Sequence, residues 1–177
     1  MPTENELKYA LKLSDDFEAQ VAELAKIYLD INQGYVYNKD GLTLRVREAV
    51  WSDGSPEHLM TVKMHTPDRL MEIETQICYR DFEDFWNEAQ DQLSKRRYKV
   101  YNDNEVWEID FFRDNGQTYF IMAEVELPEG KDRPDAIPSW LEHSILFEDS
   151  HRGSSLTSSK LSSVAYASSI YNSILQS

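Results

Sequence analysis

The sequence predicts an α+β fold in which a sheet closes into a barrel with helices packed outside it. Three observations lead to this prediction. Segments with the two-residue period of strands are interrupted by stretches with the spacing of helices. Charged residues occupy every second position in most of these strands, opposite apolar residues. The charged positions are also sorted by sign from strand to strand, which a face open to water does not require.

The amino-terminal part predicts a strand, a helix and the beginning of a hairpin. Residues 4–13 alternate as a strand, and Ser14 is the expected N-cap of the helix that follows. A β-like pattern resumes at residues 35–37, and residues 38–41 form a turn into a strand at residues 42–50. The helix extends over about four turns because apolar residues recur at helical spacing, namely Phe17, Val21, Leu24, Ala25, Tyr28 and Leu29.

Two further strands and a second helix are predicted for the middle of the chain. The strands cover residues 59–64 and 70–79. Asp81 is the expected N-cap of the helix. Its apolar stripe consists of Phe82, Phe85, Trp86, Ala89 and Leu93.

The carboxyl-terminal part predicts a β-hairpin and a closing helix. Strands at residues 106–112 and 118–127 flank Asp114-Asn115-Gly116, a sequence typical of tight hairpin turns. A charged loop rich in proline follows at residues 128–138. The serine-rich tail then carries apolar residues that favour a last helix, namely Leu161, Val164, Ile170, Tyr171, Ile174 and Leu175.

The charged faces distinguish these strands from ordinary half-exposed ones. For one strand alone, a charged side that faces water is the simpler interpretation. Over the whole set it is weaker, because solvated faces normally mix Thr, Ser, Gln and Lys, whereas here nearly every such position is charged. A barrel whose interior is charged and whose apolar side chains face the helices explains the pattern. The pairs are Arg45 with Arg47, Lys95 with Arg97, Glu72 with Glu74, Glu108 with Asp110, and Glu124 with Glu126.

A charged interior predicts bound ions of both signs. Like charges ~4 Å apart repel each other by about 4 kcal/mol at an effective dielectric constant near 20. The acidic residues therefore predict a bound cation, and the basic residues a bound anion such as a polyphosphate. Mg²⁺ or Mn²⁺ fits best, because all the candidate ligands are carboxylates and neither His nor Cys joins them.

Composition narrows the class of protein. The chain has 177 residues, enough for one domain spanning residues 1–177, and a formal net charge of -14 argues against nucleic acid or an anionic membrane as partner. The acidic amino terminus and the lack of a long apolar stretch predict a cytoplasmic protein. We expect a monomer or a homodimer. The single cysteine, Cys78, is expected to be a buried apolar residue.

In order along the chain, these segments resemble the motifs of the CYTH superfamily, the triphosphate tunnel metalloenzymes. The match runs from Glu4 to about Asp149, and it implies an eight-stranded antiparallel barrel that forms a tunnel, with helices outside. The matching segments are Glu4, Glu6 and Lys8; Gln33-Gly34-Tyr35; Arg45 and Arg47; Thr61 and Lys63; Glu72 and Glu74; Lys95, Arg97 and Tyr98; Glu108 and Asp110; Glu124 and Glu126.

The resemblance also implies roles for individual residues. The basic set would bind the triphosphate substrate, namely Lys8, Arg45, Arg47, Lys63, Lys95 and Arg97. The acidic set would hold Mg²⁺ or Mn²⁺ as cofactor, namely Glu4, Glu6, Asp110, Glu124 and Glu126. Glu6, Lys8 and Arg45 are the expected catalytic residues.

The resemblance predicts an enzyme that hydrolyses a triphosphate with the help of a divalent metal. Inorganic tripolyphosphate is the favoured substrate, and nucleoside or thiamine triphosphate remains open. The alternatives are an adenylate cyclase of class IV type, which shares the tunnel, and a module that binds polyphosphate or nucleotide without turnover. Formation of cyclic AMP from ATP would identify the first alternative, and tight binding without product would identify the second.

Overall fold

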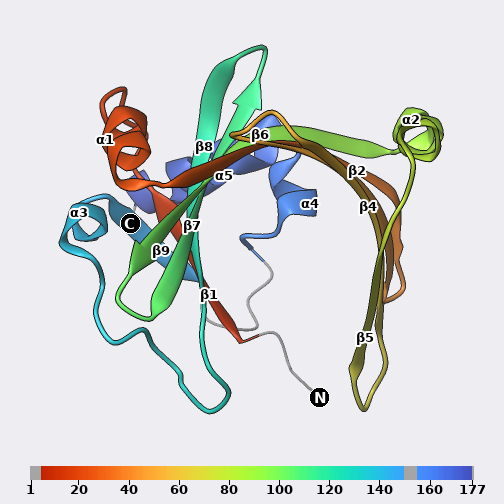
Figure 1. The fold of residues 1–177 in the computed structure, drawn as a ribbon. Helices are drawn as coiled ribbons and strands as arrows, with labels where there is room; N and C mark the ends of the chain where they lie inside the picture. The colour runs from red at the N-terminus through yellow and green to blue at the C-terminus, as the bar shows by residue number, and fades with distance from the viewer. Residues whose placement is uncertain (1–4, 150–154, 177) are drawn as a thin grey trace.

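The fold is built on one strongly curved antiparallel sheet with helices on both of its faces (Figure 1). The computed structural model describes residues 5–149 and 155–176. Its nine strands follow the order β5-β4-β3-β2-β6-β7-β8-β1-β9. Their bounds are β1 (Glu6–Leu11), β2 (Ile27–Lys39), β3 (Leu42–Trp51), β4 (Pro56–His65), β5 (Leu70–Gln76), β6 (Asp91–Asn102), β7 (Glu105–Asp114), β8 (Gln117–Glu126) and β9 (Ile145–Asp149).

In the described residues, five helices accompany the sheet. They are α1 (Phe17–Leu24), α2 (Tyr79–Glu88), α3 (Ser139–Glu142), α4 (Ser158–Leu161) and α5 (Val164–Leu175). The antiparallel α+β architecture predicted from the sequence is therefore confirmed. None of the helices in the described part of the chain is long and apolar enough to cross a membrane.

The predicted closure of the barrel is wrong. The described strands form an open sheet, with β5 at one edge and β9 at the other. The strand β1, which would be one edge of an eight-stranded sheet, pairs with β8 on one side and with β9 on the other. Residues of α4 and of the turn before it line the concave side of the sheet, so a helix occupies part of the space that the closed barrel would enclose.

Two predicted helices end earlier than their apolar spacing indicates. Tyr28 and Leu29, expected in the first helix, lie in β2, and Leu93, expected in the second, lies in β6. Both strands are central, since β2 pairs with β3 and β6, and β6 pairs with β2 and β7. Pairing on both sides supplies hydrogen bonds and packing that outweigh weak local helix preferences.

The α2 amino terminus also differs from its prediction. Cys78, not Asp81, is the N-cap residue, and its Sγ accepts a hydrogen bond from Asp81 N at 3.4 Å. Cys78 is exposed rather than buried in the core. The β7–β8 hairpin is confirmed, with Asn115 and Gly116 both at positive φ as its tight turn requires.

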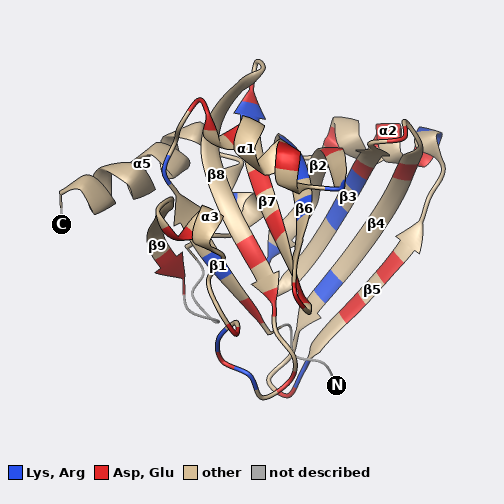
Figure 2. Ribbon diagram, turned by 60° about the vertical axis from the view of Figure 1, so that its left-hand side comes forward, with Lys and Arg blue, Asp and Glu red and all other residues tan. Residues whose placement is uncertain are grey.

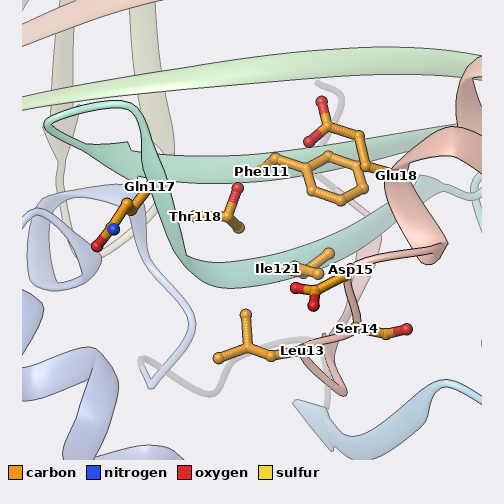
Figure 3. Close-up of a pocket in the computed structure, with 8 residues that line it drawn as sticks. All are labelled: Leu13, Ser14, Asp15, Glu18, Phe111, Gln117, Thr118 and Ile121. Atoms are coloured by element: carbon orange, nitrogen blue, oxygen red, sulfur yellow. The ribbon is translucent and has the colours of Figure 1, made fainter.

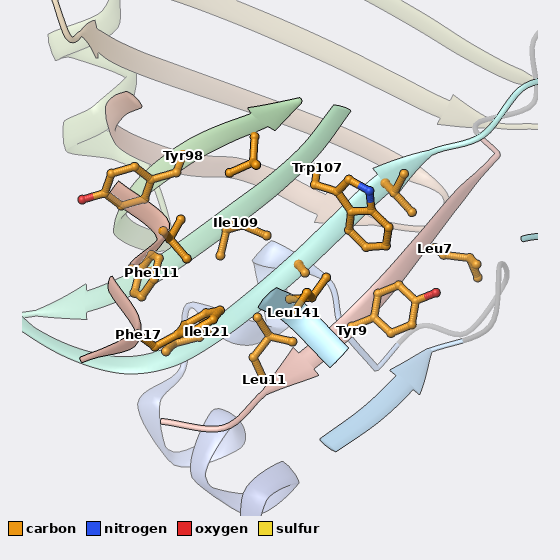
Figure 4. Packing of buried hydrophobic residues seen from close by; sticks show 14 of the residues in the cluster. Leu7, Tyr9, Leu11, Phe17, Tyr98, Trp107, Ile109, Phe111, Ile121 and Leu141 are labelled. Atoms are coloured by element: carbon orange, nitrogen blue, oxygen red, sulfur yellow. The ribbon is translucent and has the colours of Figure 1, made fainter. Parts of the chain in front are cut away.

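Apolar side chains form a layer on each face of the sheet. One layer lies beneath α1 and α3, where Trp107, Ile109 and Phe111 of β7 pack on residues such as Tyr9, Phe17 and Leu141 (Figure 4). The other lies on the opposite face, where Phe112 and Phe120 pack against Leu161 and Ala167 of the carboxyl-terminal helices. The alternation of strand side chains divides the residues of one strand between the two layers.

Gly34 sets how closely α2 approaches the sheet. A Cβ atom added to this β2 residue would lie 2.9 Å from Ala89 Cβ and 3.2 Å from Trp86 Cε3. Both neighbours belong to the end of α2, which packs on β2, β3 and β4. A glycine at this position thus allows the helix to cover the strand directly.

We expect the substitution Gly34→Ala to lower the free energy of unfolding by about 1–3 kcal/mol, because the added methyl group overpacks this contact. Denaturant unfolding of the variant measures the change. Gly34→Ala should cost less stability in the Ala89→Gly variant than in the wild type, because the closest methyl group is then absent. This cost is the difference between the double variant Gly34→Ala/Ala89→Gly and Ala89→Gly alone. An unfolding midpoint equal to that of the wild type would contradict this packing.

Candidate functional site

The concave face of the sheet contains a cavity of about 640 Å³ lined by charged side chains. Figure 2 shows bands of basic residues on β3 and of acidic residues on β5, with β4 between these two strands in the sheet. The cavity brings together all six of the basic residues expected to bind substrate. They are Lys8 of β1, Arg45 and Arg47 of β3, Lys63 of β4, and Lys95 and Arg97 of β6.

Four glutamates line the same cavity, so its lining carries two more basic than acidic side chains. They are Glu6, Glu72, Glu74 and Glu124. A positive excess in this cavity contrasts with the net charge of -14 of the chain. Asp110 and Glu108 pair with Lys95 and Arg97 without lining the cavity and offset this excess, so the cavity concentrates basic side chains rather than net positive charge.

Acidic and basic side chains of this face form ion pairs with each other, most of them between neighbouring strands. Lys63 Nζ lies 3.4 Å from Glu72 Oε2, and these residues are register partners on β4 and β5. Lys8 Nζ lies 2.6 Å from Glu6 Oε1 and 3.8 Å from Glu124 Oε2. The sequence argument that each set needs an external ion is therefore too strong, because much of the charge is compensated within the sheet.

Asp110 is the most buried charge of this face, with 0% of its surface exposed. Its Oδ2 accepts hydrogen bonds from Lys95 Nζ at 2.6 Å and from Arg97 Nη2 at 2.8 Å, while its Oδ1 accepts one from Arg97 Nε at 2.6 Å. Arg97 also pairs with Glu108. Asp110, predicted as a metal ligand, thus holds two cations in place.

The pKa values of this group follow from burial and pairing. Burial alone would raise the pKa of Asp110, but the charges of Arg97 and Lys95 hold it well below its usual range. Burial lowers the pKa of Lys95 to about 8, although Asp110 opposes the shift. Lys95 therefore carries a proton that it can lose near neutral pH.

Arg45 and Arg47 are the least satisfied cations of the cavity. Arg45 Nη2 donates to Thr61 Oγ1 at 3.1 Å, and that hydroxyl donates to Glu74 Oε2 at 2.9 Å. Glu74 Oε2 itself lies 3.7 Å from Arg45 Nη2 and 3.8 Å from Arg47 Nη2, so two guanidinium groups share one carboxylate. Burial and the neighbouring Arg45 lower the pKa of Arg47.

The Nε atoms of both arginines are buried and have no hydrogen-bond acceptor within residues 5–149 and 155–176. Buried donors of charged groups are normally paired, so these two mark a position where an acceptor is missing. An anion with several oxygen atoms would supply acceptors at this position.

The acidic side of the face forms a smaller pocket of about 250 Å³ that shares two residues with the main cavity. Glu6, Glu108, Glu124 and Glu126 line it, and within residues 5–149 and 155–176 no Lys or Arg does. Burial raises the pKa of Glu124, and Glu6 raises it further, while Arg97 opposes the shift. A cation beside Glu6 and Glu124 would relieve this crowding of negative charge.

The acidic pocket fits Mg²⁺ or Mn²⁺ by donor chemistry, since its ligands are hard carboxylate oxygens. Across the described ranges, no three Asp, Glu, His or Cys side chains converge into a ready metal site. Glu4, an expected ligand, lies outside the described residues. Of the other expected ligands, Glu6, Glu124 and Glu126 line this pocket, whereas Asp110 is not among its lining residues.

Several residues of the cavity carried no signal in the sequence. Thr157, Ser158 and Ser159, from the first turn of α4 and the residue before it, line the cavity. Ser158 Oγ accepts a hydrogen bond from Lys95 Nζ at 3.5 Å. His65 also lines the cavity. A serine-rich tail reads as a linker or a helix in sequence, and only the packing of α4 and α5 on the concave face places its hydroxyl groups here.

A second pocket of about 590 Å³ lies near α1 and does not join this site (Figure 3). It carries the acidic residues Asp15 and Glu18, and no basic residue is among its lining residues. Glu18 is already engaged, because Tyr98 Oη donates to it at 2.9 Å and Arg113 pairs with it. Its chemistry does not suit an anion, and the concave cavity remains the candidate site.

Comparison with known proteins shows the fold. No protein-family model and no curated protein sequence matches the chain. The solved structure of the hypothetical protein NE1496 has 23% sequence identity and a TM-score of 0.58, covering 90% of this chain and 97% of that chain. The PH1819 protein from Pyrococcus horikoshii OT3 has 20% identity and a TM-score of 0.51, covering 73% of this chain and 81% of that chain. At these identities the similarity is one of fold.

We expect Asp110→Asn to lower the free energy of unfolding by about 3–5 kcal/mol, because Lys95 would lose its buried counter-charge and Arg97 one of its two. Denaturant unfolding at pH 7 measures the change. The double variant Asp110→Asn/Lys95→Met should regain part of it, since one of the two cations is removed. Undiminished stability of Asp110→Asn would contradict the assigned role.

The pH dependence of this difference has a defined sign. Because the folded pKa of Asp110 lies below that of an unfolded Asp, its stabilising effect is complete above about pH 4 and is lost as the pH falls further. The stability difference between wild type and Asp110→Asn should therefore shrink as the pH falls below about 4.

Proposed function

We propose that this protein is a divalent-metal-dependent triphosphatase of the CYTH superfamily, with inorganic tripolyphosphate as its favoured substrate. The observation that supports the proposal most is the convergence of six basic side chains from four strands on one cavity. Arg45 and Arg47, which line that cavity, each also keep a buried Nε donor that has no acceptor in the described part of the chain. A phosphate chain offers charge and acceptors together, spread along its length.

The basic residues would bind the phosphate oxygens and hold the chain in a fixed orientation. Arg45 and Arg47 offer guanidinium groups that suit phosphate oxygens. Lys8, Lys63 and Lys95 offer point charges from three different strands. In a partly buried cavity these cations would also stabilise the charge that develops on the oxygens during P–O cleavage.

Glu6, Glu124 and Glu126 would hold Mg²⁺ or Mn²⁺, together with Glu4 as the resemblance implies. When bound, the metal would supply charge neutralisation at the phosphate oxygens. Asp110 acts from behind this site by fixing Lys95 and Arg97. Its buried position and its two cationic partners fit this role better than that of a ligand.

Glu6 is the proposed base for the attacking water. Its carboxylate lines both the main cavity and the acidic pocket, so it lies where the bound phosphate and the metal would meet. Water would attack the terminal phosphorus, the bridging P–O bond would break, and the water proton would pass to Glu6. The products from tripolyphosphate are orthophosphate and pyrophosphate.

Release of orthophosphate from tripolyphosphate with Mg²⁺ or Mn²⁺ tests the proposal. We expect Arg45→Ala to lower kcat/KM by about 100-fold or more, the usual effect of removing one donor that stabilises transition-state charge. Glu6→Gln should lower kcat by about 100-fold to 10000-fold, the usual contribution of a general base. Removal of the metal with a chelator should abolish turnover.

Arg96→Ala is the matched control for the arginine variant. Arg96 is a neighbour of Arg97 on β6, but it points to the other face and pairs with Asp30, with Nε 2.7 Å from Oδ1. Its loss should leave turnover within about twofold of the wild type, as is usual for surface ion pairs. Full activity of both Arg45→Ala and Glu6→Gln would refute the proposal, and tight binding without product would identify a binding module.

Affinity for tripolyphosphate should fall as the pH rises through about 8. The pKa of Lys95 in the free protein is about 8. Below this pH Lys95 is already protonated, whereas above it Lys95 must take up a proton when the anion binds. Isothermal titration between pH 6.5 and pH 9.5, roughly spanning the expected change, measures the slope against Lys95→Met. The variant lacks the titration of Lys95, whereas the ionisation of tripolyphosphate itself affects both proteins equally. Identical pH profiles for both proteins would contradict the assignment.

A further inference from the structure

Two neutral side chains stand out in the charged cavity. Gln33 and Tyr35 lie two residues apart on β2 and line the cavity, with only 2% and 7% of their surfaces exposed. Gln33 Nε2 donates a hydrogen bond to Tyr35 Oη at 2.8 Å. The phenol oxygen is therefore held in place by a partner on its own strand.

The proton of the Tyr35 hydroxyl has no acceptor in the described part of the chain. The hydrogen bond from Gln33 uses the oxygen as an acceptor, and Tyr35 Oη donates to no residue within the ranges 5–149 and 155–176. Burial raises the pKa of Tyr35 above its ordinary value of 10.0, although Arg45 opposes the shift. The hydroxyl thus stays protonated under ordinary conditions and is a buried donor without an acceptor.

The position of Tyr35 in the sheet connects the two groups of basic residues. Strand β2 lies between β3 and β6 in the sheet order, and Tyr35 is the register partner of Arg45. On one side are Arg45, Arg47 and Lys63, and on the other are Lys95 and Arg97. A phosphate chain that contacts both groups must pass over β2, where this hydroxyl lies.

We propose that Tyr35 donates its phenolic proton to an oxygen in the middle of the bound phosphate chain, and that Gln33 positions it. The inference rests on the proposed function and names a residue that selects for the length of the anion. Lysine and arginine attract any anion, whereas a fixed neutral donor contacts only an oxygen at one place. A single phosphate bound by either basic group has no reason to reach it.

Tyr35→Phe in the complete chain tests the inference, with tripolyphosphate and orthophosphate as the two probes. We expect tripolyphosphate affinity to fall about tenfold, the usual effect of losing a hydrogen bond to a charged group, and orthophosphate affinity to change by less than about twofold. In turnover, KM should rise with kcat nearly unchanged, because the contact is made in both the ground state and the transition state. A merely structural change would alter both probes and kcat together.

Tyr119→Phe is the matched control, since its hydroxyl donates to Leu161 O at 2.8 Å and does not line the cavity. It should leave both affinities unchanged. Gln33→Met removes the positioning amide while it keeps a similar volume, and it should reproduce part of the loss. The double variant Gln33→Met/Tyr35→Phe should bind no more weakly than Tyr35→Phe alone, because Gln33 acts through Tyr35.

The outcomes separate this inference from the proposed function. A wild-type chain that binds no tripolyphosphate overturns the proposed function and this inference with it. A wild type that binds, with Tyr35→Phe binding equally well, overturns only this inference. Additive losses in the double variant overturn the positioning role of Gln33. If Tyr35→Phe does not fold, an unchanged tripolyphosphate affinity of Gln33→Met overturns the inference.

Discussion

A carboxylate buried between two cations organises the concave face of this sheet. Asp110 on β7 binds Lys95 and Arg97 on β6, and both of its carboxylate oxygens accept hydrogen bonds from these two side chains. Burial of one such charge without partners would be strongly unfavourable, so the three side chains must be buried together. They thereby fix the register of β6 against β7 and aim two basic groups at the cavity. The rest of the site is arranged around this group.

The remaining charges follow a graded pattern of compensation. Lys63 has a carboxylate opposite it on the next strand, and Lys8 lies between two. Arg45 and Arg47 share Glu74 at longer distances, and each keeps a buried Nε donor that has no acceptor among the described residues. Partial compensation reduces the repulsion between like charges when no ligand is bound. It also leaves Arg45 and Arg47 on β3 able to bind an anion. This balance suits the proposed binding and release of a phosphate chain.

The apolar layers explain how a charged face can exist inside a folded domain. The layer beneath α1 and α3 buries the alternate side chains of β1, β6, β7 and β8, and the carboxyl-terminal helices cover an apolar part of the opposite face. The charged cavity is what remains of that face between α4 and the strands β1 to β6 and β8. The hydrophobic stabilisation thus comes from surfaces adjacent to the site and does not depend on it.

The sequence by itself determined the parity of the strands, and with it which charged residues share the concave face. Arg45 and Arg47, Lys95 and Arg97, or Glu124 and Glu126 lie two residues apart, and the pleat of any strand places such residues on one face. What the tertiary structure decided is which charges meet. Asp110, predicted as a metal ligand, became the partner of two cations because β7 pairs with β6, and the hydroxyl groups of residues 157–159 entered the cavity because α4 packs on the concave side. Strand pairing is a long-range interaction that local periodicity does not encode. For this reason the sequence pattern missed that Tyr28, Leu29 and Leu93 are strand residues. For the same reason it did not show that the sheet is open.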